Sequence, residues 1–233
     1  MFWIGTSGYN YLEWRGNFYP ANLPPAKMLA FYAGQFQTVE INYTFYRLPT
    51  EAMLRGWAAA TPAQFRLTLK APRRITHDAK LQNCRPLVET FVATALTLHE
   101  KLGVLLFQMP PTFKLALPVL DEFLGWLPAT ARAAFEFRHP SWHVPEVFAR
   151  LRQHNAALCI AESEKMATPV VMTADFGYFR LRDEGYTLDD LRQWAARMRD
   201  EQAGCGDIFV YFKHEEAGKG PEFAKELMRL LET

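Results

Sequence analysis

Eight short apolar segments recur along the 233-residue chain, and nearly all of them are separated by stretches with helical character. Each segment has the length of a strand and is apolar on both faces except near its carboxyl end, as parallel strands buried on both faces are. The segments cover residues 2–6, 38–42, 66–70, 104–108, 134–138, 156–161, 178–182 and 207–213. Eight strands alternating with helices predict an α/β fold, a closed TIM (β/α)8 barrel, built as one domain over residues 1–233.

Local signals mark where the intervening helices begin and end. Thr50 is expected to cap one helix, Thr187 and the acid Asp190 form a capping-box pattern at another, and Gly103 is expected to end a third in the left-handed conformation. The expected helices cover residues 26–36, 51–60, 87–101, 115–127, 145–154, 188–201 and 222–231. The sixth crossover is short and interrupted by Pro169, so its helix is expected to be short or missing.

Composition excludes several classes of protein. Hydrophobic residues make up 49% of the chain and aromatic residues 14%, which provides a large core and argues against disorder. The net charge of +1 gives no overall attraction to a polyanion or a membrane. Three widely spaced cysteines and the lack of a signal-like or long apolar segment lead us to expect a cytoplasmic protein with reduced thiols and no membrane partner. The oligomeric state is not fixed by these features.

A polar residue stands at the carboxyl end of each predicted strand. These residues are Ser7, Asn42, Lys70, Gln108, Arg138, Glu162, Arg182 and Lys213. The carboxyl ends of barrel strands meet at one mouth, which is where TIM-barrel active sites lie. Glu40, Glu136 and Arg180 stand one pleat deeper, where ionic groups are costly to bury unless they are paired. A ring of polar ends over buried ionic groups predicts a functional pocket at the mouth.

The stretch at residues 132–143, RAAFEFRHPSWH, shows this pattern most clearly. Glu136 and Arg138 alternate with two phenylalanines, so the acid and the guanidinium point the same way at the end of a strand. Pro140 then breaks the chain into an aromatic loop that contains Trp142. An active-site strand end accounts for this arrangement, and a structural ion pair that closes the strand is the alternative.

Several motifs, in order along almost the whole chain, match a known family. They are Gly5-Thr6-Ser7-Gly8-Tyr9, Val39-Glu40-Ile41-Asn42, Lys70-Ala71-Pro72, Leu106-Phe107-Gln108-Met109-Pro110-Pro111, Glu136-Phe137-Arg138-His139-Pro140-Ser141-Trp142 and Tyr178-Phe179-Arg180-Leu181. The chain resembles the DUF72, or YecE-like, family of TIM-barrel proteins. The resemblance implies the barrel and a mouth built from the matched residues, but no settled reaction. Arg182-Asp183 and the loop 213–216 depart from the family pattern, so ligand contacts of those loops are not carried over.

The residues at the expected mouth suggest roles in binding and catalysis. Four cations suit a phosphate or carboxylate, three aromatic rings could stack on a base or sugar, and Glu40 and Glu136 are candidate catalytic acid and base groups if the cavity separates their pKa values. The candidate substrate-binding residues are Tyr9, Asn42, Tyr46, Lys70, His77, Gln108, Arg138, Trp142, Arg180 and Lys213.

These candidates support an acid–base enzyme, of hydrolase or isomerase type, that acts on a small anionic substrate such as a phosphorylated sugar or nucleotide. Glycoside hydrolysis would also fit two carboxylates. The alternative is a non-catalytic nucleotide or nucleic-acid binding module that uses the same basic and aromatic pocket, with nucleic acid the less favoured partner. No organic cofactor motif is present. A divalent metal is not favoured, because the available side chains lack tight ligand spacing: His77, His139, His214, Glu162 and Glu215.

Overall fold

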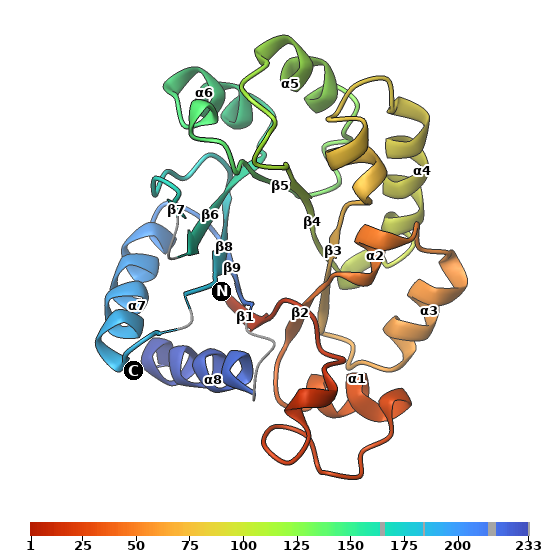
Figure 1. The fold of residues 1–233 in the computed structure, drawn as a ribbon, viewed down its shortest axis with the longest axis vertical. Coiled ribbons are helices and arrows are strands. Elements are labelled where there is room, and N and C mark those ends of the chain that lie inside the picture. The colour runs from red at the N-terminus through yellow and green to blue at the C-terminus, as the bar shows by residue number, and fades with distance from the viewer. Residues whose placement is uncertain (164–165, 184, 214–217, 233) are drawn as a thin grey trace.

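Eight parallel strands form a nearly closed barrel in the computed structural model, which describes residues 1–163, 166–183, 185–213 and 218–232 (Figure 1). The strands are β1 (Phe2–Thr6), β2 (Thr38–Ile41), β3 (Arg66–Lys70), β4 (Leu102–Gln108), β5 (Ala133–Glu136), β6 (Ala157–Ser163), β8 (Phe176–Leu181) and β9 (Asp207–Phe212). Neighbours pair in the order β1-β9-β8-β6-β5-β4-β3-β2. The predicted TIM-barrel fold is confirmed, and both ends of the chain contribute strands to the same barrel.

A tyrosine holds the seam between β1 and β2. A single bridge joins the two strands there, between Ser7 and Glu40. The hydroxyl of Tyr32 accepts a hydrogen bond from the amide of Thr6 at 2.7 Å and donates one to the carbonyl of Thr38 at 3.1 Å. This hydroxyl therefore satisfies backbone groups that a neighbouring strand would otherwise pair.

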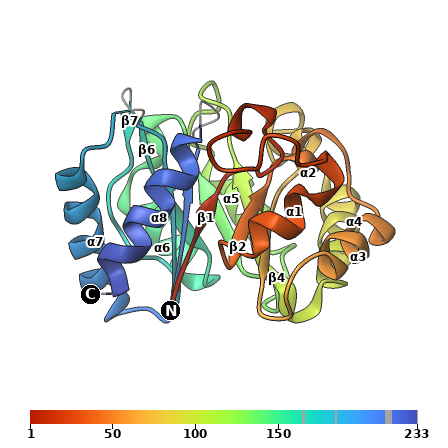
Figure 2. The same ribbon diagram turned by 90° about the horizontal axis from the view of Figure 1, so that it is seen from below.

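Helices surround the strands, as Figure 1 shows down the barrel and Figure 2 shows from the side. They are α1 (Pro25–Ala33), α2 (Tyr43–Tyr46), α3 (Glu51–Ala59), α4 (Arg85–Leu96), α5 (Leu117–Leu124), α6 (Pro145–Gln153), α7 (Leu188–Gln202) and α8 (Lys219–Glu232). Thr50 accepts a hydrogen bond from the amide of Met53, and Thr187 and Asp190 form a complete capping box. Both predicted caps are confirmed.

Two local predictions have different outcomes. The described residues between β6 and β8 form no helix but a short strand, β7 (Met166–Ala167), antiparallel to β6, as the interrupted crossover led us to expect. The prediction that Gly103 caps a helix is wrong. Gly103 lies inside β4, and a Cβ atom there would come within 2.6 Å of the Thr68 hydroxyl, while His99 adopts the positive φ of 50°.

Buried apolar side chains form two cores on opposite faces of the sheet. The outer core packs strand residues such as Phe107 and Phe135 against the helices. The inner core fills the barrel with residues of the opposite parity, among them Leu106, Ala134 and Phe209. Alternation along each strand therefore decides which side chains enter the barrel.

No helix in the described ranges combines the length and apolar character needed to span a bilayer.

Candidate functional site

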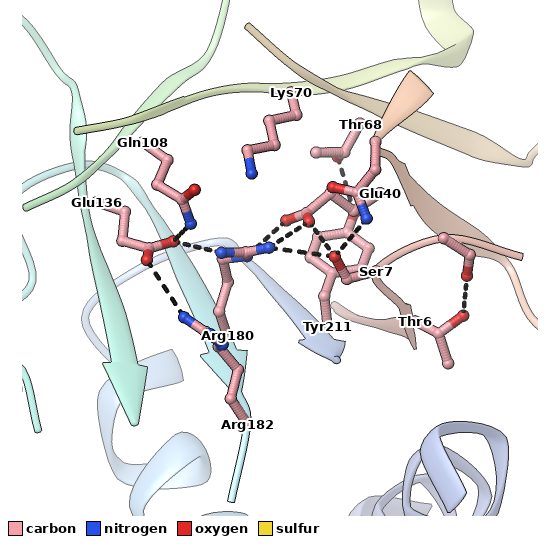
Figure 3. Close-up of polar contacts among 12 residues, drawn as sticks. Thr6, Ser7, Glu40, Thr68, Lys70, Gln108, Glu136, Arg180, Arg182 and Tyr211 are labelled. Atoms are coloured by element: carbon pink, nitrogen blue, oxygen red, sulfur yellow. Dashed lines mark hydrogen bonds and ion pairs between the residues drawn. The ribbon is translucent and has the colours of Figure 1, made fainter. Parts of the chain in front are cut away.

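Arg180 is the centre of a buried ionic network at the carboxyl end of the barrel (Figure 3). It lies on β8, points into the barrel, and is only 1% exposed. Its Nε and Nη2 atoms donate to the two carboxylate oxygens of Glu40 at 3.0 and 2.8 Å, and Nη1 donates to Glu136 Oε2 at 2.5 Å. One guanidinium thus joins carboxylates from β2 and β5, across the barrel.

Glu40 is held by hydrogen bonds on both oxygens. Ser7 Oγ donates to Oε1 and the hydroxyl of Tyr178 donates to Oε2, each at 2.5 Å. Ser7 Oγ in turn accepts from the side-chain amide of Asn42 at 3.0 Å. Burial alone would raise the pKa of Glu40, but the charge of Arg180 and these hydrogen bonds outweigh it and lower the pKa. Glu40 is therefore an ionised, fully occupied carboxylate.

Glu136 differs, because only one of its two oxygens accepts hydrogen bonds from the described residues. Oε2 accepts from Arg180 and, at 2.8 Å, from the amide of Gln108. Oε1 is buried and accepts no hydrogen bond from the described residues. Arg138 Nε and Arg182 Nη1 lie 3.7 and 3.9 Å from it, too far for good hydrogen bonds. Burial would raise the pKa of Glu136, yet Arg180 and the Gln108 hydrogen bond lower it to about 2.

Lys70 lies at the end of β3 and carries its amine into the space between Glu40 and Glu136 (Figure 3). The Nζ atom sits 4.3 Å from the centroid of the Phe45 ring, and within the part of the chain that the structure describes it makes no hydrogen bond or ion pair. Burial, reinforced by the charge of Arg180, lowers the pKa of Lys70 to about 7 against the partial opposition of the two glutamates. At neutral pH a large fraction of this amine is unprotonated.

The remaining predicted binding residues range from half-buried to exposed. Asn42 Oδ1 is buried without a hydrogen-bond partner in the described ranges. His77 Nδ1 is 2.9 Å from the Thr76 hydroxyl and its ring packs on Phe45, while burial and the charge of Lys70 lower its pKa. Lys213 lies close enough to help lower the pKa of Lys70. Tyr46, 78% exposed, stands at the rim, edge-on to Phe45.

Two aromatic residues predicted to line the mouth, Trp142 and Tyr9, pack against the outer core. Trp142 is fully buried, stacks on Phe137 with ring centroids 4.5 Å apart, and donates its indole N–H to the carbonyl of Phe113. The prediction that it stacks on a ligand is therefore wrong: the short helical turn at Pro140–Trp142 folds the ring back into the outer core. Tyr9 packs partly buried against the same core, beside Tyr32.

The strand-end ring has one exception, Glu162. This carboxylate accepts hydrogen bonds from the Tyr186 hydroxyl and the Trp194 indole, both at 2.8 Å, and thus faces α7 rather than the mouth. It shares its parity with Leu158 and Ile160, which belong to the outer core. The prediction that Glu162 joins the ring is wrong, because alternation along β6 sends it outward.

The structure adds residues that were not among the candidate binding set. Ser7 and Arg182 were recognised only as polar strand ends, yet both contact the ionic network. Tyr178 was not selected, although it precedes Arg180 by two positions and must share its face. The same period of two that indicated Arg180 would have indicated Tyr178.

Among the residues described, no group of three or more His, Cys, Asp or Glu side chains is placed to hold a metal ion. His214 and Glu215, two of the side chains considered for a metal, lie outside the described residues.

Basic side chains outnumber carboxylates in this part of the barrel. Arg138, Arg180 and Arg182 lie within 4 Å of the carboxylates, and both carboxylates are already bound to Arg180. Lys70 and Lys213 are the two further basic side chains of the site. The excess positive charge is held by the partly exposed side chains, 32% for Arg138 and 23% for Arg182.

Comparison with known proteins places the chain in a family. Residues 3–233 match the profile of a family described as a protein of unknown function, DUF72. The UPF0759 protein YecE of Escherichia coli K12 is 37% identical over 112 residues, which are 48% of this chain and 41% of that protein, so the matched part spans less than half of that relative. The UPF0759 protein YunF of Bacillus subtilis is 22% identical over 100% of this chain and 95% of its own length.

Solved structures show the same fold. A DUF72 family protein from Thermotoga maritima superposes with a TM-score of 0.88 at 25% identity, covering 100% of both chains. A DUF72 family protein from Enterococcus faecalis gives a TM-score of 0.83 at 18% identity, covering 100% of this chain and 96% of its own. With a family match over nearly its whole length, the chain belongs to the DUF72 family, and its fold is a TIM barrel.

Proposed function

We propose that this protein is an enzyme whose active site is the mouth of the barrel, where Lys70 exchanges a proton with a small anionic substrate. The observation that carries the proposal is the position of the Lys70 amine. Lys70 is 9% exposed, and its amine rests on the Phe45 ring with no hydrogen-bond or ion-pair partner within the described ranges. A buried amine with a pKa near neutrality is matched to acid–base work at pH 7.

The cations around Lys70 supply the affinity for an anion. Arg138 and Arg182 lie 3.7 and 3.9 Å from Glu136 Oε1, and both side chains are partly exposed. A phosphate or carboxylate can receive two parallel hydrogen bonds from one guanidinium, which also fixes its orientation. Phosphorylated sugars, nucleotides and small carboxylic acids are the substrate classes that fit these groups.

We assign Glu40 and Glu136 a positioning role rather than the roles of acid and base considered from the sequence. Acid–base work by two glutamates requires pKa values that differ and lie near the working pH. Here the pKa of each is lowered by Arg180, so both carboxylates are ionised at pH 7. They fix Arg180 and set the electric field in which Lys70 titrates.

A turnover screen with matched variants tests this proposal. Wild-type protein is assayed against phosphorylated sugars, nucleotides and small carboxylic acids, alongside Lys70→Met and the exposed-surface control Lys27→Met. We expect turnover by wild type and Lys27→Met, at least a 100-fold loss in Lys70→Met, and tighter anion binding in wild type than in Arg138→Ala. Turnover that survives in Lys70→Met, or no turnover of any compound, would contradict the proposal.

The exposed ring of Tyr46 favours a second candidate, a non-catalytic module that binds a nucleotide or a single-stranded nucleic-acid end. Tyr46 is a large, exposed aromatic side chain next to the basic mouth, and such a ring stacks on bases without regard to sequence. Binding of a short oligonucleotide that falls about 10-fold or more in Tyr46→Ala, with no turnover by wild type, would favour the module.

A further inference from the structure

Lys70 and Lys101, both among the described residues, have pKa values that burial lowers, and their amines have different surroundings. Lys101 Nζ donates to the carbonyls of Ala58 and Thr61 and to the Thr61 hydroxyl, so its three protons are all engaged. Lys70 Nζ has only the face of Phe45 beneath it and, as far as the described ranges show, no acceptor. The hydrogen bonds of Lys101 show that its amine has a structural role. The amine of Lys70 has no comparable contacts that would give it such a role.

We propose that Lys70 is a nucleophile that forms a Schiff base with a small aldehyde or ketone bearing a carboxylate or phosphate. This inference rests on the proposed active site at the mouth and narrows its substrate class to anionic carbonyl compounds. The amine sits at the carboxyl end of a barrel strand, directed into the space between two carboxylates (Figure 3). A buried, unprotonated lysine is the form that attacks carbonyl carbon.

The reaction needs no component beyond the two partners. The Nζ lone pair forms a bond to the carbonyl carbon while the carbonyl π electrons move to oxygen, and transfer of one proton from nitrogen to oxygen gives the carbinolamine. Departure of that oxygen with a second proton from nitrogen releases water and leaves the imine. One water molecule is lost, and no group is oxidised or reduced.

The charged groups near Lys70 act on its amine in opposite directions. Arg180 and Lys213 disfavour the ammonium form, Glu136 and Glu40 favour it, and burial tips the balance toward the free amine. The charge of Lys70 helps lower the pKa of His77, so the His77 ring is also near the amine. Once the imine takes up a proton it carries a positive charge, and the unpaired Oε1 of Glu136 is a buried negative group available to stabilise it.

The anionic end of the substrate has its own partners. Arg138 and Arg182 flank the same Glu136 oxygen at 3.7 and 3.9 Å without forming short hydrogen bonds to it. They remain free to turn toward a phosphate or carboxylate.

Reductive trapping tests the inference directly. Wild-type protein is mixed at pH 7 with pyruvate, glyoxylate or glyceraldehyde 3-phosphate and cyanoborohydride, and modified lysines are located by peptide mass spectrometry. A lysine with the ordinary pKa of about 10.4 has less than about one part in a thousand of free amine at pH 7. We expect Lys70 to be labelled at least 100-fold faster than the exposed Lys27 and Lys114, with the label absent at that site in Lys70→Met.

Calorimetric binding of the same compounds, measured in parallel without reductant, separates this inference from the proposed function. Binding that depends on Arg138 together with unselective labelling overturns the Schiff base and leaves an anion-binding active site. Failure of both binding and labelling contradicts the inference and the proposed function together. The comparison of lysines within wild-type protein does not depend on any variant folding, and methionine at position 70 keeps an unbranched apolar chain to lie on Phe45.

Discussion

Replacing Arg180 by glutamine perturbs the buried network at its centre. The two carboxylates that Arg180 joins, Glu40 and Glu136, are fully buried. Breaking a buried ion pair by removing one partner costs about 3–5 kcal/mol, because an uncompensated charge remains inside the protein. This one substitution leaves two buried carboxylates without their guanidinium partner. We therefore expect the free energy of unfolding of Arg180→Gln at pH 7 to be about 5 kcal/mol below that of wild type, measured by urea unfolding followed by circular dichroism.

The same substitution should reverse the pH dependence of stability. In the wild type the folded pKa of Glu136, about 2, lies below its ordinary value of 4.5. This carboxyl therefore contributes stability, about 3 kcal/mol, that is present above the ordinary pKa and lost as the pH falls toward 2. Arg180 is the largest influence that opposes burial, so we expect its loss to raise the folded pKa of Glu136 above the ordinary value. The variant should then gain stability as the pH falls from 7 to 5.

Arg229→Gln is the matched control, because the Arg229 side chain is 75% exposed and is not paired with either buried carboxylate. It should change the free energy of unfolding by no more than about 0.5 kcal/mol. An Arg180→Gln variant within about 1 kcal/mol of wild type at pH 7, or one whose stability still rises from pH 5 to pH 7, would show that Arg180 does not hold the two carboxylates ionised.

Three further substitutions test local features of the barrel, by urea unfolding unless another measurement is given. Tyr32→Phe removes the hydroxyl at the β1–β2 seam and should cost about 1–3 kcal/mol, whereas the exposed Tyr43→Phe should cost almost nothing; equal effects would argue against the seam. Gly5→Ala would place a Cβ atom 2.2 Å from the Thr38 carbonyl oxygen, so we expect loss of folding or a backbone shift visible by NMR, and an unchanged spectrum would be contrary. Thr187→Ala removes a helix cap and should cost about 1 kcal/mol, with no loss counting against the capping box.

Strand periodicity carried most of what the sequence could reveal about the fold and the site. Glu40, Glu136 and Arg180 stand at positions where alternation and the cost of burying charge together require them to meet, and the structure brings them together. Alternation alone does not say which face of a strand enters the barrel when both faces are apolar. Glu162 was misplaced for this reason, since its outward partners Tyr186 and Trp194 come from later in the chain.

Other features depend on packing between distant segments and could not be read locally. The turn after β5 folds Trp142 onto Phe113, which precedes it by 29 positions, so a loop aromatic became a core residue. Gly103 is required by its close approach to Thr68 on the neighbouring strand, not by a helix end. The low pKa of Lys70 arises from burial and from Arg180 on a strand far along the chain.

The titration of Lys70 is the most direct test of the central claim, that the mouth of this barrel holds a free amine over fixed buried charges. NMR of lysine Cε and Nζ shifts, with the Lys70 signal assigned by its absence in Lys70→Met, gives the pKa of this one side chain. We expect a pKa of about 7 for the Lys70 amine. A Lys70 that titrates with the exposed lysines, near the ordinary value of about 10.4, would contradict it.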